Sequence, residues 1–172
     1  IIASHIPLYL STNKDGKEIL SGHLSKANEG WASFENNEEV LVIFPGQHTY
    51  ISPSWYSHEN VPTWNYIAVH VYGSSRIIEG EELLDSLKKL VNKYEKGSTN
   101  PVSVEKMNPE LVNREMKGIV GFEILINDLQ AAYKLSQNRS EKDYDNIIDE
   151  LSKNSSDPNS VGIAEEMRKK KF

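Results

Sequence analysis

The sequence lacks cysteine entirely, which excludes disulfide bonds and thiolate chemistry. It also lacks a long apolar run. The longest candidate is Val40–Phe44, far short of the roughly 18 residues that cross a bilayer. No stretch has the basic, apolar and small-residue pattern of a signal peptide. Together these absences predict a cytoplasmic protein with no membrane partner.

Positive charge is scarce as well. The chain has 19 Lys and Arg against 25 Asp and Glu, a formal net charge of −6. This balance disfavours broad adhesion to nucleic acid or to an anionic membrane. The one basic cluster, residues 168–171, is typical of a solvated helix end, where cations also favour the helix dipole. A nucleic-acid contact through this cluster is the alternative.

The familiar catalytic and metal-binding motifs are missing. Five histidines are present, but no pair has the spacing of a known zinc site and no HExxH occurs. The chain also contains no Gly-x-Ser-x-Gly elbow, no P-loop and no Gly-x-Gly-x-x-Gly. We therefore expect no metal site and assign no catalytic residue, and ATP or Rossmann-type dinucleotide binding is disfavoured.

Alternating apolar and polar residues predict strands over the first two thirds of the chain. The pattern is clearest from Asn65 to Ile78. Asp15-Gly16 is a strong hairpin signal. Pro45-Gly46 and Asn127-Asp128 are interpreted as further turns. The expected strands span residues 4–10, 18–24, 40–44, 48–52, 65–78, 119–126 and 129–135.

Helical spacing begins after these first strands. Leucines at 83, 87 and 90 predict an amphipathic helix that opens at Gly80. Residues 96–110 are polar and read as a loop. Ser140 with Asp143 resembles a helix-capping pair, and a last helix is expected from about Ser160.

Six or seven strands in mostly sequential order, with one helix inserted and others at the end, predict a mainly β (α+β) fold. We expect a single domain over residues 1–172, built as a small antiparallel barrel with a helical extension at about 140–172. An antiparallel α+β sandwich is the competing architecture.

Aromatic residues concentrate in one block. Residues 50–73 hold six of the fifteen aromatics and run directly into the clearest strand. A loop of this composition at the mouth of a strand suits a flat aromatic ligand with polar edges. The alternative is that these residues belong to the core and to turns.

Two other segments are dense in hydrogen-bond donors. Residues 22–28 (GHLSKAN) offer an imidazole, a hydroxyl, an ammonium and an amide where the second strand ends, which suits a phosphate. Residues 134–139 (KLSQNR) lie where a late strand hands over to a helix, a favoured place for an anionic ligand. In both segments the alternative is ordinary turn and cap residues.

Taken together, these segments resemble the PaiB family of FMN-binding split-barrel proteins. The motifs fall in order across nearly the whole chain, and the pairing of VPTWNY with KLSQNR is very specific. The matching segments are SHIP at 4–7, GHLSKAN at 22–28, FPGQHTYISPSWY at 44–56, VPTWNYIAVHVYG at 61–73, GIVGFEI at 118–124 and KLSQNR at 134–139.

The resemblance implies a six-stranded split barrel and a homodimer with FMN sites at the subunit interface. By this resemblance, the phosphate and ribityl chain would contact His23, Ser25, Lys26 and Asn28. The isoalloxazine would be flanked or edged by Trp55, Trp64, Asn65 and Tyr66. The site would be closed by Lys134, Gln137 and Arg139, which could come from the second subunit.

The resemblance further implies a negative transcriptional regulator of the type that represses protease production and sporulation. The alternative is a flavin-dependent oxidoreductase, such as a flavin reductase, or a haem-binding split-barrel enzyme. Family members usually begin with an additional N-terminal stretch, so we expect a segment to be missing before Ile1.

Overall fold

The structure is a computed structural model that describes residues 3–34 and 39–169. Short 3-10 helices occur at η1 (Glu29–Phe34), η2 (Pro53–Trp55) and η3 (Val104–Lys106). The main elements are β1 (Tyr9–Thr12), β2 (Glu18–Ser25), β3 (Glu39–Ile51), β4 (Thr63–Ile78), α1 (Gly80–Glu95), α2 (Pro109–Met116), β5 (Ile119–Lys134), α3 (Glu141–Lys153) and α4 (Pro158–Lys169). The predicted α+β class is confirmed.

The five strands form one sheet in the order β1-β2-β5-β4-β3. Strand β2 pairs antiparallel with both neighbours, so that Leu20 lies opposite Leu10 on one side and Ile124 on the other. The β1–β2 hairpin turns at Gly16, whose φ of 76° lies in the left-handed region that glycine adopts without strain. The hairpin predicted at Asp15-Gly16 is therefore confirmed.

Two predicted turns lie inside continuous strands, so the sheet has five strands among the described residues and not six. Pro45 lies within β3, an edge strand of the sheet. Its missing N–H is tolerated there, because an edge strand has a hydrogen-bonded neighbour on one side only. Asn127 lies within β5, where its side-chain amide donates to Ser74 Oγ on neighbouring β4 at 2.9 Å. The first strand is also shorter than the predicted range 4–10, since it spans Tyr9–Thr12.

The chain divides into two compact units. The first consists of residues 1–41 and 72–128, and the second of residues 42–71 and 129–172. Both β4 and β5 contribute residues to each unit. The expectation of a single domain stays a prediction.

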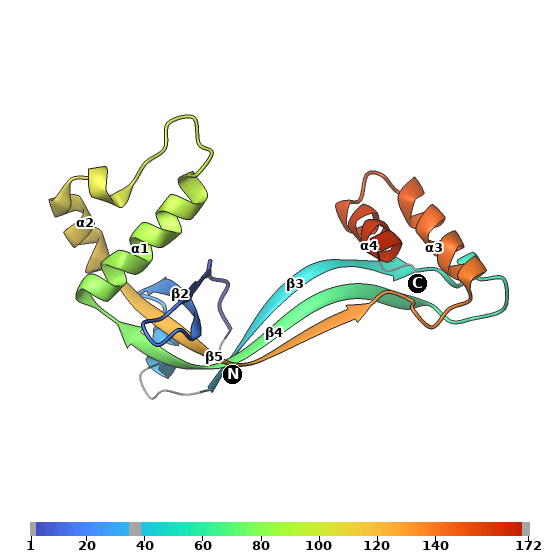
Figure 1. Cartoon of the computed structure of the whole chain (residues 1–172), viewed down its shortest axis with the longest axis horizontal. Coiled ribbons are helices and arrows are strands. Elements are labelled where there is room, and N and C mark those ends of the chain that lie inside the picture. The colour runs from blue at the N-terminus through green and yellow to red at the C-terminus, as the bar shows by residue number, and fades with distance from the viewer. Residues whose placement is uncertain (1–2, 35–38, 170–172) are drawn as a thin grey trace. The chain divides into compact units, whose positions relative to one another are not determined.

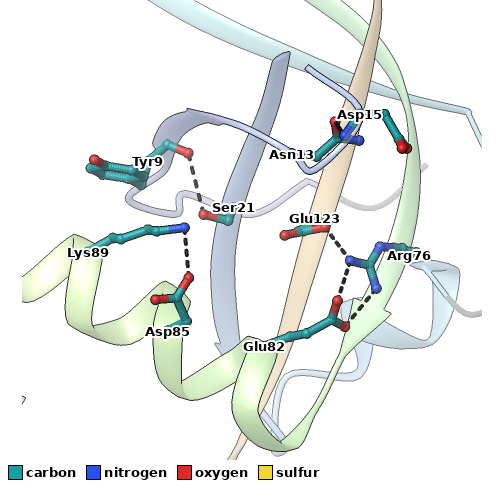
Figure 2. Close-up of polar contacts among 9 residues, drawn as sticks. All are labelled: Tyr9, Asn13, Asp15, Ser21, Arg76, Glu82, Asp85, Lys89 and Glu123. Carbon is teal, nitrogen blue, oxygen red and sulfur yellow. Dashed lines mark hydrogen bonds and ion pairs between the residues drawn. The ribbon is translucent and has the colours of Figure 1, made fainter. Parts of the chain in front are cut away.

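In the first unit, α1 packs against one face of β5, where a Cβ at Gly121 would lie 2.6 Å from Leu83 Cδ1. The buried Phe122 points to the opposite face, because successive residues of a strand alternate, and its ring centroid lies 4.6 Å from that of Phe34. Polar contacts support the same packing. Arg76 on β4 donates to both carboxylate oxygens of Glu82 on α1, at 2.9 and 3.0 Å, and to Glu123 on β5 at 2.5 Å (Figure 2). One guanidinium thus links the start of α1 to two strands.

In the second unit, α3 and α4 lie side by side against the ends of the long strands (Figure 1). The Tyr144 hydroxyl donates to the Met167 carbonyl at 2.9 Å and joins the two helices. The buried cluster here is Ile51, Tyr56, Leu135, Tyr144, Ile147, Ile148, Leu151, Ile163, Ala164 and Met167.

Most helix boundaries follow from local signals. The predicted start at Gly80 is confirmed, and Ser140 caps α3 by accepting from Asp143 N at 3.2 Å. The last helix begins at Pro158, two residues before the predicted start. Helix α2 begins at Pro109, inside the stretch that was predicted as a loop. Its signal was local, because the Asn108 side chain caps it and proline suits the first helical position.

Candidate functional site

Residues 25–28 form the turn by which the chain leaves β2. Ser25 Oγ accepts from Ala27 N at 3.3 Å, and Asn28 Oδ1 accepts from Gly30 N at 3.0 Å. The backbone N–H of Lys26 donates to Gly118 O at 2.9 Å. Ser25 and Asn28 therefore shape the turn, and Lys26 is an exposed residue on a backbone that is held in place.

His23 lies on β2 just before this turn and is half-buried. Burial lowers the pKa of its imidazole below the usual value, because a buried cation loses hydration. Near neutral pH the ring is therefore uncharged. In this neutral form it can donate or accept a hydrogen bond.

A cavity of about 450 Å³ opens beside Lys26 in the first unit. We call it the Lys26 cavity. Ile78, Leu83 and Val120 give it an apolar wall. Its charged lining residues are the cations Lys26 and Lys117 and one carboxylate, Glu79. The volume lies in the usual range for small-molecule sites, and an apolar wall with a few convergent charges is their usual lining.

A second cavity of about 450 Å³ lies in the second unit, and we call it the tryptophan cavity. Trp55 and Trp64 both line it, with His48 and Tyr50 beside them. The Trp64 ring lies 5.9 Å from the His48 ring and 6.3 Å from the Tyr50 ring, measured between centroids, and Trp64 is 52% exposed. This grouping offers aromatic faces to a ligand.

Acidic groups complete the tryptophan cavity. Glu150 and Asp157 both line it. The Ser160 hydroxyl donates to Asp157 at 2.7 Å, and this bond is the largest of the effects that lower the pKa of that carboxyl. Asp157 therefore remains ionised near neutral pH. The negative charge of these carboxylates disfavours a phosphate in the tryptophan cavity, but it is compatible with an aromatic ring system.

Side chains alternate along the start of β4. Trp64 and Tyr66 are exposed, while Asn65 between them is fully buried. Asn65 Oδ1 accepts from Ser136 Oγ at 3.0 Å, and Asn65 Nδ2 donates to Met167 Sδ at 3.6 Å. Asn65 is thus bonded within the second unit.

A third cavity, of about 500 Å³, lies where β5 ends, and we call it the Arg139 pocket. Lys134, Gln137 and Arg139 line it together with Asn65. Lys134 Nζ donates to Thr63 Oγ1 at 2.7 Å and lies 6.0 Å from the Tyr66 ring centroid. The lining is polar and basic.

The structure thus distributes the predicted site residues over distinct places. His23, Ser25, Lys26 and Asn28 lie in the first unit, and the other seven lie in the second. Within the second unit, the two tryptophans share one cavity, and Asn65 shares another with Lys134, Gln137 and Arg139. That all these groups contact one flavin across a dimer interface stays a prediction.

Several lining residues were not among the candidates. Lys117 adds a second cation to the Lys26 cavity, and His48 adds a ring to the tryptophan cavity. His48 lies within the FPGQHTY motif, so the sequence carried a signal for it. Lys117 follows helix α2, which was not predicted, and nothing in the local pattern indicated its position.

Two kinds of feature are not found among residues 3–34 and 39–169. No helix there is both long enough and apolar enough to span a membrane. No group of three or more His, Cys, Asp or Glu side chains is placed there to hold a metal ion.

Comparison with solved structures identifies proteins of similar fold. The chain is similar to the FAD and heme binding protein from Mycobacterium smegmatis, with a TM-score of 0.51 at 12% identity, over 80% of this chain and 71% of that one. At this identity the likeness shows the fold alone. The molecule is therefore a split-barrel protein of the α+β class.

Sequence comparison then defines the family. The model of the family described as "Putative FMN-binding domain" matches residues 1–128. The chain is 51% identical over 169 residues to "Protease synthase and sporulation protein PAI 2" of Bacillus subtilis (strain 168), across 98% of this chain and 81% of that protein. The chain belongs to this PaiB family of FMN-binding-domain proteins, which confirms the resemblance.

The family extends to fungi. "Uncharacterized protein AN0679" of Emericella nidulans is 32% identical over 185 residues, across 86% of this chain and 74% of that protein. The family description supports FMN as the cofactor.

Proposed function

We propose that this protein binds FMN and works as a flavin-binding regulatory protein. The observation that carries the proposal is the Lys26 cavity, which lies in the region that the FMN-binding family model matches. Its two lysines suit a phosphate, and its apolar wall suits the less polar part of the cofactor.

In this proposal the residues at the end of β2 recognise the phosphate end of FMN. Lys26 supplies charge-assisted hydrogen bonds, which are stronger than those between neutral groups. His23 serves as a neutral donor, since burial lowers its pKa. The aromatic faces of Trp55 and Trp64 are the candidates to contact the isoalloxazine, in the assembled protein.

Titration of the purified full chain with FMN, followed by flavin fluorescence, tests this role. Lys26→Gln should weaken FMN binding by roughly 1–3 kcal/mol, the contribution of a hydrogen bond to a charged group. Lys96→Gln is the matched control, because Lys96 is exposed at the opposite end of α1 from the cavity. Unchanged affinity in Lys26→Gln would remove Lys26 from the site.

The regulatory part of the proposal rests on the Bacillus subtilis relative, whose name refers to protease synthesis and sporulation. Direct DNA binding has little electrostatic support in a chain of net charge −6. At the basic C-terminus, Arg168 donates to Ser152 and Lys169 pairs with Glu166. The other two basic residues of that cluster, Lys170 and Lys171, lie outside the described residues. We therefore favour regulation through a partner protein.

A band-shift assay with promoter DNA at physiological salt separates the two routes. We expect no shift that depends on residues 168–171. A salt-dependent shift that is lost when these four are changed to alanine would establish DNA contact. Bleaching of bound flavin by NADH or NADPH would instead define an oxidoreductase.

The protein is also proposed to be a homodimer. In the second unit, large apolar side chains on three strands remain exposed, among them Trp64 at 52% and Leu129 at 53%. Tyr50 and Trp64 adjoin each other, with ring centroids 6.3 Å apart, and adjoining exposed apolar side chains are typical of an interaction surface. This set, which we call the exposed apolar set, is Ile43, Phe44, Tyr50, Trp64, Tyr66, Leu129 and Tyr133.

A further inference from the structure

The Arg139 pocket has features that the FMN proposal does not use. The family model ends at residue 128, whereas six of the eight lining residues lie between Tyr133 and Arg139. The other two, Thr63 and Asn65, come from the start of β4. With about 500 Å³, the pocket is large enough for a small organic molecule.

The loop that builds this pocket is held in an unusual conformation. Ser136 has φ of 60°, and it is the one non-glycine residue with positive φ among the described residues. Its hydroxyl donates to buried Asn65 Oδ1 at 3.0 Å, which anchors the loop to β4. Strained backbone of this kind persists where surrounding contacts over-determine it, and it clusters at ligand sites.

Gln137 stiffens the same loop. Its Oε1 accepts from Leu135 N at 2.8 Å, and its Nε2 donates to Tyr133 O at 2.6 Å. The amide therefore bonds to the backbone on either side of Lys134. A pocket rim that is fixed before a ligand arrives lowers the entropy cost of binding.

The charge of the pocket is unbalanced. Lys134 and Arg139 both line it, and its lining contains no carboxylate. Within the described part of the chain, neither cation takes part in an ion pair with Asp or Glu. In a protein of net charge −6, two such cations in one cavity favour an anionic ligand.

Arg139 adds an independent observation. Its guanidinium lies 4.8 Å from the Tyr56 ring centroid, a cation–π contact that fixes the orientation of the group. Its Nε is buried and has no acceptor among the described residues. Buried donors are nearly always bonded, so an unsatisfied guanidinium N–H beside a cavity indicates a place for an oxyanion.

We propose that the Arg139 pocket binds the phosphate group of a small molecule, with Arg139 and Lys134 as its charged ligands. FMN has a single phosphate, which the proposal above assigns to Lys26, so the expected ligand here is another phosphorylated metabolite. The FMN phosphate shares the same chemistry and is the alternative that the experiment separates. The Lys134 ammonium gives one N–H to Thr63 and keeps the others for the ligand. The inference does not depend on Lys26 and the cavity beside it.

Inorganic phosphate is the probe, and the full-length chain is the sample. Isothermal titration calorimetry gives the affinity, and amide chemical shifts of residues 136–139 in NMR spectra locate the site. Arg139→Gln and Lys134→Gln should each weaken phosphate binding about tenfold or more, because each removes a charge-assisted bond. Lys142→Gln is the matched control, since Lys142 is an exposed cation of the same unit outside the pocket lining.

The result that would overturn the proposal is phosphate affinity that is equal in wild type, Lys134→Gln and Arg139→Gln. Absence of saturable binding at millimolar phosphate would overturn it as well. Lys134 is exposed, so its variant keeps the test valid if Arg139→Gln fails to fold.

A second set of titrations identifies the source of the phosphate. Phosphate is titrated into protein saturated with FMN and, separately, with riboflavin, which lacks the phosphate. If FMN blocks phosphate binding at residues 136–139 and riboflavin does not, the pocket holds the flavin phosphate. If phosphate still binds beside FMN, the ligand is another phosphorylated metabolite. Lys26→Gln should leave phosphate binding in the Arg139 pocket unchanged. A failure of the FMN proposal at Lys26 can therefore be distinguished from a failure of the phosphate proposal at Arg139.

Discussion

At the scale of single residues, Gly73 shows how closely β4 approaches β5. A Cβ built at this position would overlap the carbonyl oxygen of Leu125 and lie 2.5 Å from Ile124 Cγ2. Backbone cannot move aside as a flexible side chain can. Glycine is therefore required here by the close approach of two strands and not by its φ angle.

We expect Gly73→Ala to lower the free energy of unfolding by about 1–3 kcal/mol, the usual cost of overpacking a filled interior. Urea denaturation measures the change. Gly118→Ala is the control, because a Cβ there meets its nearest atom at 3.4 Å, and it should stay within about 0.5 kcal/mol of wild type. Equal stability of the two variants would contradict the close approach.

His23 leads to a prediction about pH. Burial lowers its pKa in the folded state below the unfolded value of 6.5. Between these two pKa values the unfolded chain binds more protons than the folded one, so stability rises with pH across this window and falls as the solution is acidified. Well above pH 6.5, where the ring is neutral in both states, the group contributes no pH dependence.

The measurement is urea unfolding of wild type and His23→Gln at several pH values from about 5 to 7.5. The wild type should lose more stability on acidification below pH 6.5 than the variant does, because the variant has no proton to take up. Parallel pH profiles would show that burial does not suppress protonation of His23.

At the scale of elements, the capping of α3 connects a sequence pattern with the packing of the second unit. Ser140 Oγ accepts from Asp143 N at 3.2 Å. Asp143 Oδ1 in turn accepts from Ser57 N at 2.7 Å, which ties the first turn of the helix to the aromatic block. This bond from the Ser57 backbone is the largest effect that lowers the pKa of the Asp143 carboxyl.

Ser140→Ala should destabilise the protein by about 1 kcal/mol, the typical loss when a serine cap is removed. Ser155→Ala is the control, since Ser155 is an exposed serine in the connection between α3 and α4. Thermal denaturation followed by circular dichroism compares the two. A loss of the same size in both variants would mean that the cap makes no specific contribution.

At the scale of the whole molecule, the exposed apolar set defined above predicts self-association. Leu129→Asp places a charge among these side chains, so the variant should shift toward monomer in sedimentation velocity experiments. Leu111→Asp is the matched control, because Leu111 is an exposed leucine on α2, in the first unit. A wild-type monomer at micromolar concentration would contradict the dimer.

The fold class and the family were both accessible from sequence, because each depends on patterns along the chain. The alternation from Asn65 to Ile78 and the spacing of leucines after Gly80 correspond to β4 and α1. The two wrong turns had a common origin. Pro45-Gly46 and Asn127-Asp128 carry turn residues, but the ends of the real strands are set by pairing with neighbours. No local window contains those neighbours.

The sequence alone determined the class of protein, its PaiB-type motifs and the chemistry of the candidate side chains, since residue identity sets charge, donor capacity and periodicity. Only the tertiary structure decided which candidates lie together. The residues near Lys26 belong to the first unit and the two tryptophans to the second, and folding placed Asn65 against Ser136, 71 residues further along the chain. Strand pairing and burial bring distant segments into contact, and they decide which polar groups are already bonded and which remain available for a ligand.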